Sequence, residues 1–268
     1  MNQELKLLKT KKLFLLDMDG TLYVDHQLIG GALSFLNTLK QQNKRGIYVT
    51  NNSSKSVKDY VIKLASLGIN STVEDYYTSS MATARYLNEF HHGKTVYCMG
   101  TKSLKEELAS QGIKIAKDKD DHVDVVLIGY DTELTSQKLY DVCWLLKQDL
   151  PYIATNPDYV CPVEFGFVPD CGSFADMIYN ATKKRPIFIG KPHPRMIEYA
   201  IEATGYTKED AVIIGDRLYT DILSGIHANI TTICVLSGET TLEDIKQSDI
   251  KPDYILDSIH TVFDIIKE

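Results

Sequence analysis

Apolar residues along the chain alternate between short continuous runs and longer stripes with helical spacing. Continuous runs are typical of strands buried on both faces of a parallel sheet. Strands are predicted on this basis at residues 13–16, 45–49, 211–214, 232–235 and 254–256, where most or all residues are apolar. Strands that alternate with amphipathic helices predict an α/β fold whose parallel sheet is covered by helices.

The helical stripes have apolar residues three or four positions apart, so each predicts a helix with one face on the core. They follow Gly31, run from Val57 to Ala65, run from Met196 to Ile201, and begin again near Ser258. Ser53 or Ser54 is a good candidate for the N-cap of the second of these helices. We assign the stripes to packing and give them no chemical role.

A second series of strands and helices lies between Thr78 and Arg185. Strands are predicted at 94–98 and 123–128, and helical segments at 104–108 and 139–146. No motif-like acid pair stands at a strand end in this series, and its length of about 100 residues suits a small domain. We therefore predict a core domain formed by residues 1–80 and 184–268, with a smaller α/β domain inserted at 81–183.

Composition restricts the classes of partner. The 268 residues are 44% hydrophobic and 24% charged, with a formal net charge of −7, which argues against a broad surface for nucleic acid or anionic membrane. No run approaches the roughly 18 apolar residues of a membrane span, and 1–12 is too polar for a signal peptide. We expect a cytoplasmic protein with no nucleic-acid or membrane partner; a homo-oligomer stays open.

The five cysteines do not predict a disulfide framework or a zinc knuckle. Their number is odd, and no two of them have CxxC spacing. The pair His91-His92 is interpreted as a solvated helix end, and His193 as the start of a helix.

Two carboxylates follow the first apolar run, in the sequence Asp-Met-Asp-Gly-Thr at 17–21. Asp17 is placed at the end of the strand, and Gly20 permits a turn that re-aims Asp19. Two acids at a strand end suit Mg²⁺, which prefers oxygen ligands, and also a carboxylate nucleophile beside an acid–base partner. An Asp-Gly turn without chemical function is the alternative.

Three later segments also place polar residues directly after an apolar run. They contribute the hydroxyl of Thr50, the ammonium of Lys191, and a second acid pair formed by Asp216 and Asp221. In open parallel sheets, ligands bind outside the carboxyl ends of the strands. Four strand ends with complementary chemistry therefore predict one site for a phosphate group.

Each of these residues has a structural alternative when it is taken alone. Thr50 or Asp216 could cap a helix, Lys191 could be a solvated loop lysine, and Asp221 could be a surface acid. Their order along one chain favours phosphate chemistry over four unrelated turns.

The four segments, DMDGT, TNNSS, GKPHP and GDRLYTD, resemble the motifs of the haloacid dehalogenase superfamily. The longer contexts GKPHP and GDRLYTDI resemble its NagD-like sugar-phosphatase branch. The resemblance runs from Leu13 to the last helix. It implies a Rossmann-like core with a doubly wound parallel sheet, and a larger α/β cap between the second and third motifs.

The resemblance also implies a role for each matched residue. Asp17 attacks phosphorus and forms an aspartyl-phosphate, while Asp19 protonates the leaving alcohol and then activates water. The phosphoryl oxygens contact the hydroxyl of Thr50, the backbone N–H of Asn51 and the ammonium of Lys191.

Mg²⁺ is the implied cofactor, and carboxylates are its implied ligands. It is held by Asp17, the backbone carbonyl of Asp19, and Asp216. Asp221 acts through a water molecule or orients Asp216 and Lys191.

The predicted function is magnesium-dependent hydrolysis of small phosphorylated metabolites, namely sugar or polyol phosphates, with nucleotides as a further class. The loop from Asn156 to Gly172 is expected to reach toward the leaving group. A phosphotransferase or phosphomutase on the same core stays open, as does a non-catalytic regulator that binds a phosphometabolite. Asp19 argues against the regulator, because binding alone needs no acid–base partner. A receiver domain does not fit the chain length, and an ion pump would need membrane spans.

Overall fold

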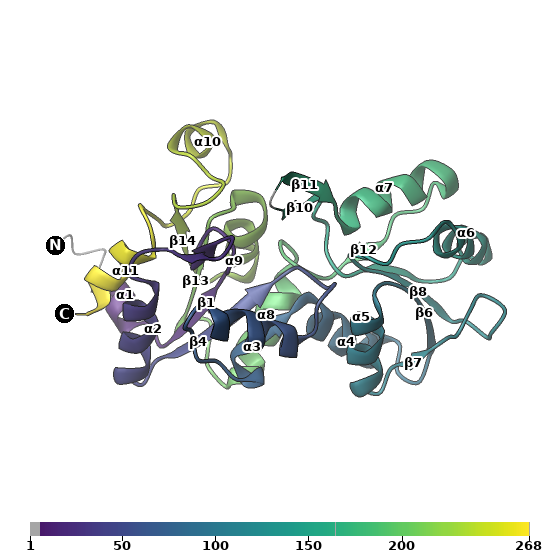
Figure 1. Cartoon of the computed structure of the whole chain (residues 1–268), viewed down its shortest axis with the longest axis horizontal. Helices are drawn as coiled ribbons and strands as arrows, with labels where there is room; N and C mark the ends of the chain where they lie inside the picture. The colour runs from purple at the N-terminus through teal and green to yellow at the C-terminus, as the bar shows by residue number, and fades with distance from the viewer. Residues whose placement is uncertain (1–5, 164, 268) are drawn as a thin grey trace. The chain divides into compact units, whose positions relative to one another are not determined.

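The computed structural model describes residues 6–163 and 165–267, which form two compact units. Unit 1 contains the described residues of 1–50, 61–77 and 191–268, and unit 2 contains those of 51–60 and 78–190. Each unit is built on its own sheet (Figure 1). The domain boundaries at 80/81 and 183/184 stay a prediction from the sequence.

Unit 1 contains a sheet of six strands in the order β15-β14-β13-β1-β4-β5. The strands are β1 (Leu13–Leu16), β4 (Arg45–Thr50), β5 (Tyr76–Thr78), β13 (Ala211–Gly215), β14 (Thr231–Val235) and β15 (Tyr254–Leu256). The pairs β1–β4, β1–β13, β13–β14 and β14–β15 are parallel. Every residue of β1 and β13 is buried, which explains why both read as continuous apolar runs.

The strand order changes direction between β1 and β13. From β1 the chain proceeds through β4 to β5, whereas from β13 it proceeds the other way, through β14 to β15. Because crossovers are right-handed, α2 (Ala32–Gln41) and α9 (Leu223–Ala228) lie on opposite faces of the sheet. The β1/β13 boundary is therefore a topological switch point, the usual place for a ligand site in such sheets.

Unit 1 also contains α1 (Lys6–Thr10), α8 (Pro194–Thr204), α10 (Leu242–Gln247), α11 (Ile259–Ile266) and residues 61–66 of α3 (Val57–Ser66). Helix α11 contacts α2, near the two chain ends in Figure 1, and α8 contacts α9. A short antiparallel hairpin, β2 (Tyr23–Val24) and β3 (Gln27–Leu28), follows β1 directly.

Unit 2 contains a five-stranded parallel sheet in the order β12-β9-β8-β6-β7. Its strands are β6 (Thr95–Met99), β7 (Lys114–Ile115), β8 (Val125–Ile128), β9 (Tyr152–Ala154) and β12 (Ile187–Phe188). Its helices are α4 (Ser79–Phe90), α5 (Lys102–Ser110), α6 (Ser136–Leu145) and α7 (Cys171–Thr182). Helix α4 contacts α5, and α6 contacts α7. A hairpin of β10 (Val160–Val163) and β11 (Gly166–Pro169) precedes α7.

The predicted α/β class with parallel sheets is confirmed. One local prediction was wrong: α3 (Val57–Ser66) begins after both Ser53 and Ser54. Ser56 and Asp59 form the N-terminal box, in which Ser56 N donates to Asp59 Oδ2 at 2.9 Å and Asp59 N donates to Ser56 Oγ at 3.3 Å. In the described part of the chain, no helix is long and apolar enough to cross a membrane.

Glu107 on α5 is a buried acid with incomplete hydrogen bonding. Its Oε1 accepts from the Thr78 hydroxyl at 3.5 Å, and its Oε2 is buried with no partner among the described residues. Burial raises the pKa of Glu107 from 4.5 to about 7, and the hydrogen bond from Thr78 opposes the shift. Between these two pKa values the folded chain binds a proton that the unfolded chain has released. The free energy of unfolding therefore falls as the pH rises through this window.

The substitution Glu107→Gln should remove this pH-dependent cost. We expect the variant to gain up to about 3 kcal/mol over the wild type near pH 8 and nothing near pH 4, measured by urea unfolding. Glu106→Gln is the matched control, because the Glu106 side chain is 67% exposed. Equal pH dependence in the wild type and in Glu107→Gln would contradict the raised pKa.

Candidate active site

Asp17 begins the site at the carboxyl end of β1. Its backbone N–H donates to the carbonyl of Ile214 at 2.9 Å, so Asp17 continues the register with β13 after Leu16. Its side chain is 17% exposed. The carboxylate is thus fixed by the sheet at the switch point while one side stays accessible.

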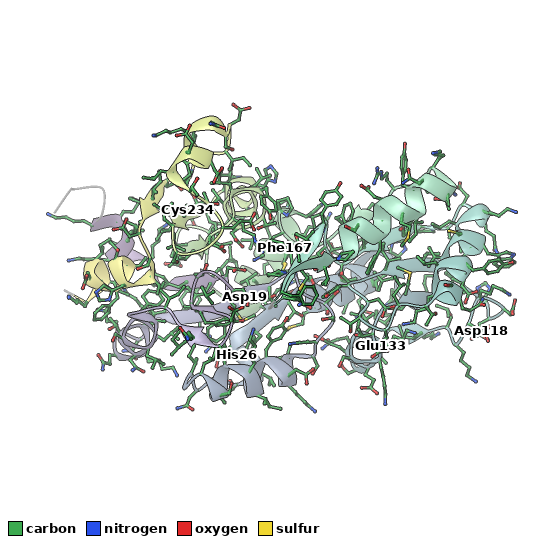
Figure 2. All side chains as sticks on the ribbon, turned by 45° about the horizontal axis from the view of Figure 1, so that its top comes forward. Asp19, His26, Asp118, Glu133, Phe167 and Cys234 are labelled. Atoms are coloured by element: carbon green, nitrogen blue, oxygen red, sulfur yellow. The ribbon has the colours of Figure 1, made fainter. Side chains whose placement is uncertain are left out.

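Gly20 makes the turn that follows. Its φ is +79°, and its N–H donates to the carbonyl of Tyr23 at 2.8 Å. A Cβ on Gly20 would lie 2.4 Å from Oδ2 of Asp216, so only glycine fits. The turn gives Asp19, labelled in Figure 2, a different environment from Asp17, because the Asp19 side chain is 51% exposed.

Lys191 is the buried cation of the site, with a side chain 3% exposed. Its Nζ lies 2.7 Å from Oδ1 of Asp17 and 2.5 Å from Oδ1 of Asp221. It also donates to the carbonyl of Val49 on β4 at 3.1 Å. The lysine therefore links the ends of two strands with a helical segment.

Asp216 follows β13 and directs its two carboxylate oxygens to different surroundings. Oδ2 accepts from the backbone N–H of Glu239 at 2.7 Å, whereas Oδ1 is buried with no partner among the described residues. Asp221 lies on a π-helical turn, Leu218–Ile222, and its Oδ2 accepts from the N–H of Arg217 at 3.3 Å.

The three carboxylates form one cluster. One carboxylate oxygen from each of Asp17, Asp216 and Asp221 lies within 4.8 Å of the others.

The electrostatics of the cluster follow from burial and from these short distances. Burial raises the pKa of Asp17 well above its usual range; the charges of Asp221 and Asp216 add to the shift, and Lys191 opposes it. Burial, followed by the charge of Asp221, raises the pKa of Asp216 to about 6. Burial disfavours the charge on Lys191, but Asp17 and Asp221 outweigh it and hold its pKa above the usual value. Three acids around one ammonium leave an excess of negative charge that a further cation would relieve.

The remaining predicted residues lie as follows. Thr50 is the last residue of β4 and is buried, and the β1–β4 register continues past Tyr48 toward it. Asn51 belongs to unit 2, where its side-chain amide donates to Oδ1 of Asp158 at 3.1 Å. The structure thus brings Asp17, Lys191, Asp216 and Asp221 into contact or close proximity, while Asp19 lies in the adjoining turn.

The sequence analysis missed the segment from Ser237 to Thr240, which follows β14. Ser237 Oγ donates to the carbonyl of Gly20 at 2.8 Å, and Thr240 N donates to the carbonyl of Asp216 at 3.1 Å. A Cβ on Gly238 would lie 2.0 Å from Oδ2 of Asp216. The signal that could have found this segment is its position, because it leaves the sheet at the same edge as Asp216.

Arg217 was also missed, although it lies inside a motif. Its Nε lies 2.8 Å from Oε2 of Glu239, so the pair ties the segment after β13 to the segment after β14. Glu239 also donates its backbone N–H to Oδ2 of Asp216, so the pair supports the residue that holds this carboxylate and leaves Oδ1 of Asp216 without a partner among the described residues.

Comparison with protein-family models assigns most of the core to one class of enzyme. Residues 14–114 match a model described as haloacid dehalogenase-like hydrolase. Residues 188–262 match a second model, described as HAD-hydrolase-like.

Similar proteins cover nearly the whole chain. The acid sugar phosphatase of Staphylococcus saprophyticus is 36% identical over 261 residues, which are 97% of this chain and 99% of the relative. Among solved structures, the 4-nitrophenylphosphatase of Thermotoga maritima is 38% identical with a TM-score of 0.93, over 97% of this chain and 99% of that one. NagD from Escherichia coli K-12 is 32% identical with a TM-score of 0.86, over 93% and 97% of the two chains. The chain therefore belongs to the haloacid dehalogenase-like hydrolases, in their NagD-like phosphatase branch.

Proposed function

We propose that the protein is a magnesium-dependent phosphatase that hydrolyses small phosphorylated metabolites through an aspartyl-phosphate on Asp17. The observation that carries this proposal is the contact of Lys191 with Asp17 inside the acidic cluster at the switch point. Sugar and polyol phosphates are the first substrate candidates, because the Staphylococcus saprophyticus relative is named an acid sugar phosphatase. Nucleotides are a further class to test.

The donor set fits Mg²⁺. Three carboxylates converge, and Asp216 Oδ1 is buried with no partner among the described residues, so it has a free lone pair for a cation. Asp17, Asp216 and the backbone carbonyl of Asp19 would hold the ion. Both oxygens of Asp221 already accept hydrogen bonds, from Lys191 and Arg217, which supports a role in orienting Lys191. Bound Mg²⁺ would supply charge neutralisation for the phosphoryl group.

The chain's own residues account for bond making and breaking. A carboxylate oxygen of Asp17 attacks phosphorus, and the bond to the leaving oxygen breaks with its electron pair staying on that oxygen. Asp19 gives its proton to the leaving oxygen and later removes a proton from the water that hydrolyses the acyl phosphate. Lys191, the Thr50 hydroxyl and the Asn51 backbone N–H stabilise the negative phosphoryl oxygens.

The inserted segment at 81–183 carries none of these groups. We propose that it acts as a lid and selects the alcohol, with the segment from Asn156 to Gly172, which contains the β10–β11 hairpin, reaching toward the leaving group. A segment of this size without catalytic motifs suits pocket formation and exclusion of water.

The proposal is tested by the release of inorganic phosphate from a panel of sugar, polyol and nucleotide phosphates, together with 4-nitrophenyl phosphate. The variant Asp17→Asn keeps the side-chain shape but removes the anionic nucleophile, so turnover should fall by several orders of magnitude. Its circular dichroism should match that of the wild type. If the variant keeps more than about a tenth of wild-type activity, a loss below ~1.4 kcal/mol, the covalent mechanism is wrong.

Removal of divalent cations should silence the enzyme, and added Mg²⁺ should restore it. Asp216→Ala should raise the Mg²⁺ concentration for half-maximal activity more than Asp221→Ala does, because only Asp216 has a free buried oxygen. Mg²⁺ titrations of the two purified variants measure this difference. Full activity in chelator would rule out the metal assignment.

Gly238→Ala tests the support of Asp216 without a change of charge. The new Cβ would collide with Oδ2 of Asp216, so the carboxylate must move. We expect the Mg²⁺ requirement to rise by about tenfold or more, as for other residues that orient a metal ligand. Gly30→Ala is the matched control, because nothing lies within 4 Å of a Cβ there. Equal Mg²⁺ requirements for both variants would show that Asp216 needs no such support.

A further inference from the structure

We propose that Lys63 and Tyr23 are positioning residues that hold the carboxyl group of Asp19 in the orientation needed for proton transfer. The proposal rests on the acid–base role of Asp19 in the proposed function. Neither residue belongs to the four motifs, and both lie in unit 1 with Asp19.

The three side chains form a closed cluster. Oδ2 of Asp19 accepts from the Tyr23 hydroxyl at 3.1 Å, and Oδ1 lies 3.4 Å from Nζ of Lys63. The Lys63 ammonium also lies over the Tyr23 ring, 4.2 Å from its centroid. Each member therefore contacts the other two, and each carboxylate oxygen has its own partner.

Local backbone structure brings these residues together. A turn at Gly20 follows Asp19, and Asp19 and Tyr23 form an isolated parallel β-bridge, so Tyr23 lies beside Asp19 at the start of the β2–β3 hairpin. The Tyr23 side chain is fully buried, which makes it a rigid support. Lys63 comes from α3, where its neighbour Leu64 packs into the core.

Orientation is the property that these contacts control. The Asp19 side chain is 51% exposed, so core packing does not restrict its rotamers as it would for a buried acid. An ion pair as exposed as Asp19–Lys63 adds little to the free energy of unfolding, so a stabilising role does not explain this contact. Proton transfer, in contrast, requires the acid within hydrogen-bond reach of the leaving oxygen. The contacts of Tyr23 and Lys63 with Asp19 would therefore favour proton transfer by orienting the carboxyl group toward the leaving oxygen.

The leaving group provides the test. Phenol is much less acidic than 4-nitrophenol, so phenyl phosphate needs the proton from Asp19 more than 4-nitrophenyl phosphate does. The value of kcat/KM covers all steps up to release of the alcohol, whichever later step limits kcat. For Lys63→Met, we expect kcat/KM for phenyl phosphate to fall about fivefold or more, and that for 4-nitrophenyl phosphate to fall less than about twofold.

Three variants separate positioning from other roles. Tyr23→Phe keeps the buried ring and removes the hydroxyl, so it should shift the ratio of the two substrates in the same direction as Lys63→Met. Lys63→Arg keeps a cation and should restore the wild-type ratio. Lys58→Met is the matched control, because Lys58 is an exposed residue of the same helix, and its ratio should not change.

Double substitution shows whether Lys63 acts through Asp19. In an Asp19→Asn background, Lys63→Met should cause no further loss, since the group it positions is already gone. If Lys63→Met lowers kcat/KM equally for both substrates, or does so in the Asp19→Asn background, Lys63 contacts the substrate itself and the proposal is wrong. If Asp19→Asn does not change the substrate ratio, the acid–base role in the proposed function fails instead.

Discussion

The buried ammonium of Lys191 between Asp17 and Asp221 is the interaction on which the site depends. A buried ion is costly unless opposite charges and hydrogen bonds replace its water, and here two carboxylates and a carbonyl do so. The same arrangement leaves the acids in excess, because Asp216 joins the cluster without a second lysine. Burial and mutual repulsion then raise the pKa values of Asp17 and Asp216. A divalent cation bound between these acids would reduce the repulsion and favour their charged forms.

Glycines let the backbone approach the clustered carboxylates closely. A Cβ on Gly215 would lie 2.3 Å from Asp221, and one on Gly20 or Gly238 would collide with Asp216. Because these glycines have no Cβ, the carboxylates of Asp216 and Asp221 fit where the chain segments after β1, β13 and β14 converge. Hydrogen bonds from Ser237 and Glu239 then connect those segments, so the acids are fixed by backbone that is itself cross-linked. Such support matters because residues that orient a metal ligand affect the affinity of the site for the metal ion.

The two acids of the first motif have different surroundings and are suited to different tasks. Asp17 is in register with β13 and contacts a buried lysine, whereas Asp19 is half-exposed and contacts a tyrosine hydroxyl and a partly exposed lysine. A nucleophile must be held in line with its target, and an acid–base group must exchange protons with the alcohol and with water. One turn after one strand thus gives the two acids the different environments that their proposed roles require, as in carboxylate pairs of other enzymes.

The sequence by itself determined the α/β class, the central strands and the acids and lysine at their ends. These features are local, because strand periodicity and turn residues can be read from neighbouring positions. The tertiary structure decided where α3 begins, since Ser53 bonds with Thr155, 102 residues away, and leaves the N-terminal box to Ser56 and Asp59. It also decided the support of Asp216 by Glu239 and of Asp19 by Lys63, 44 residues from it. Such contacts join residues far apart in sequence, and their partners are chosen only when the sheet brings the strand ends to one edge.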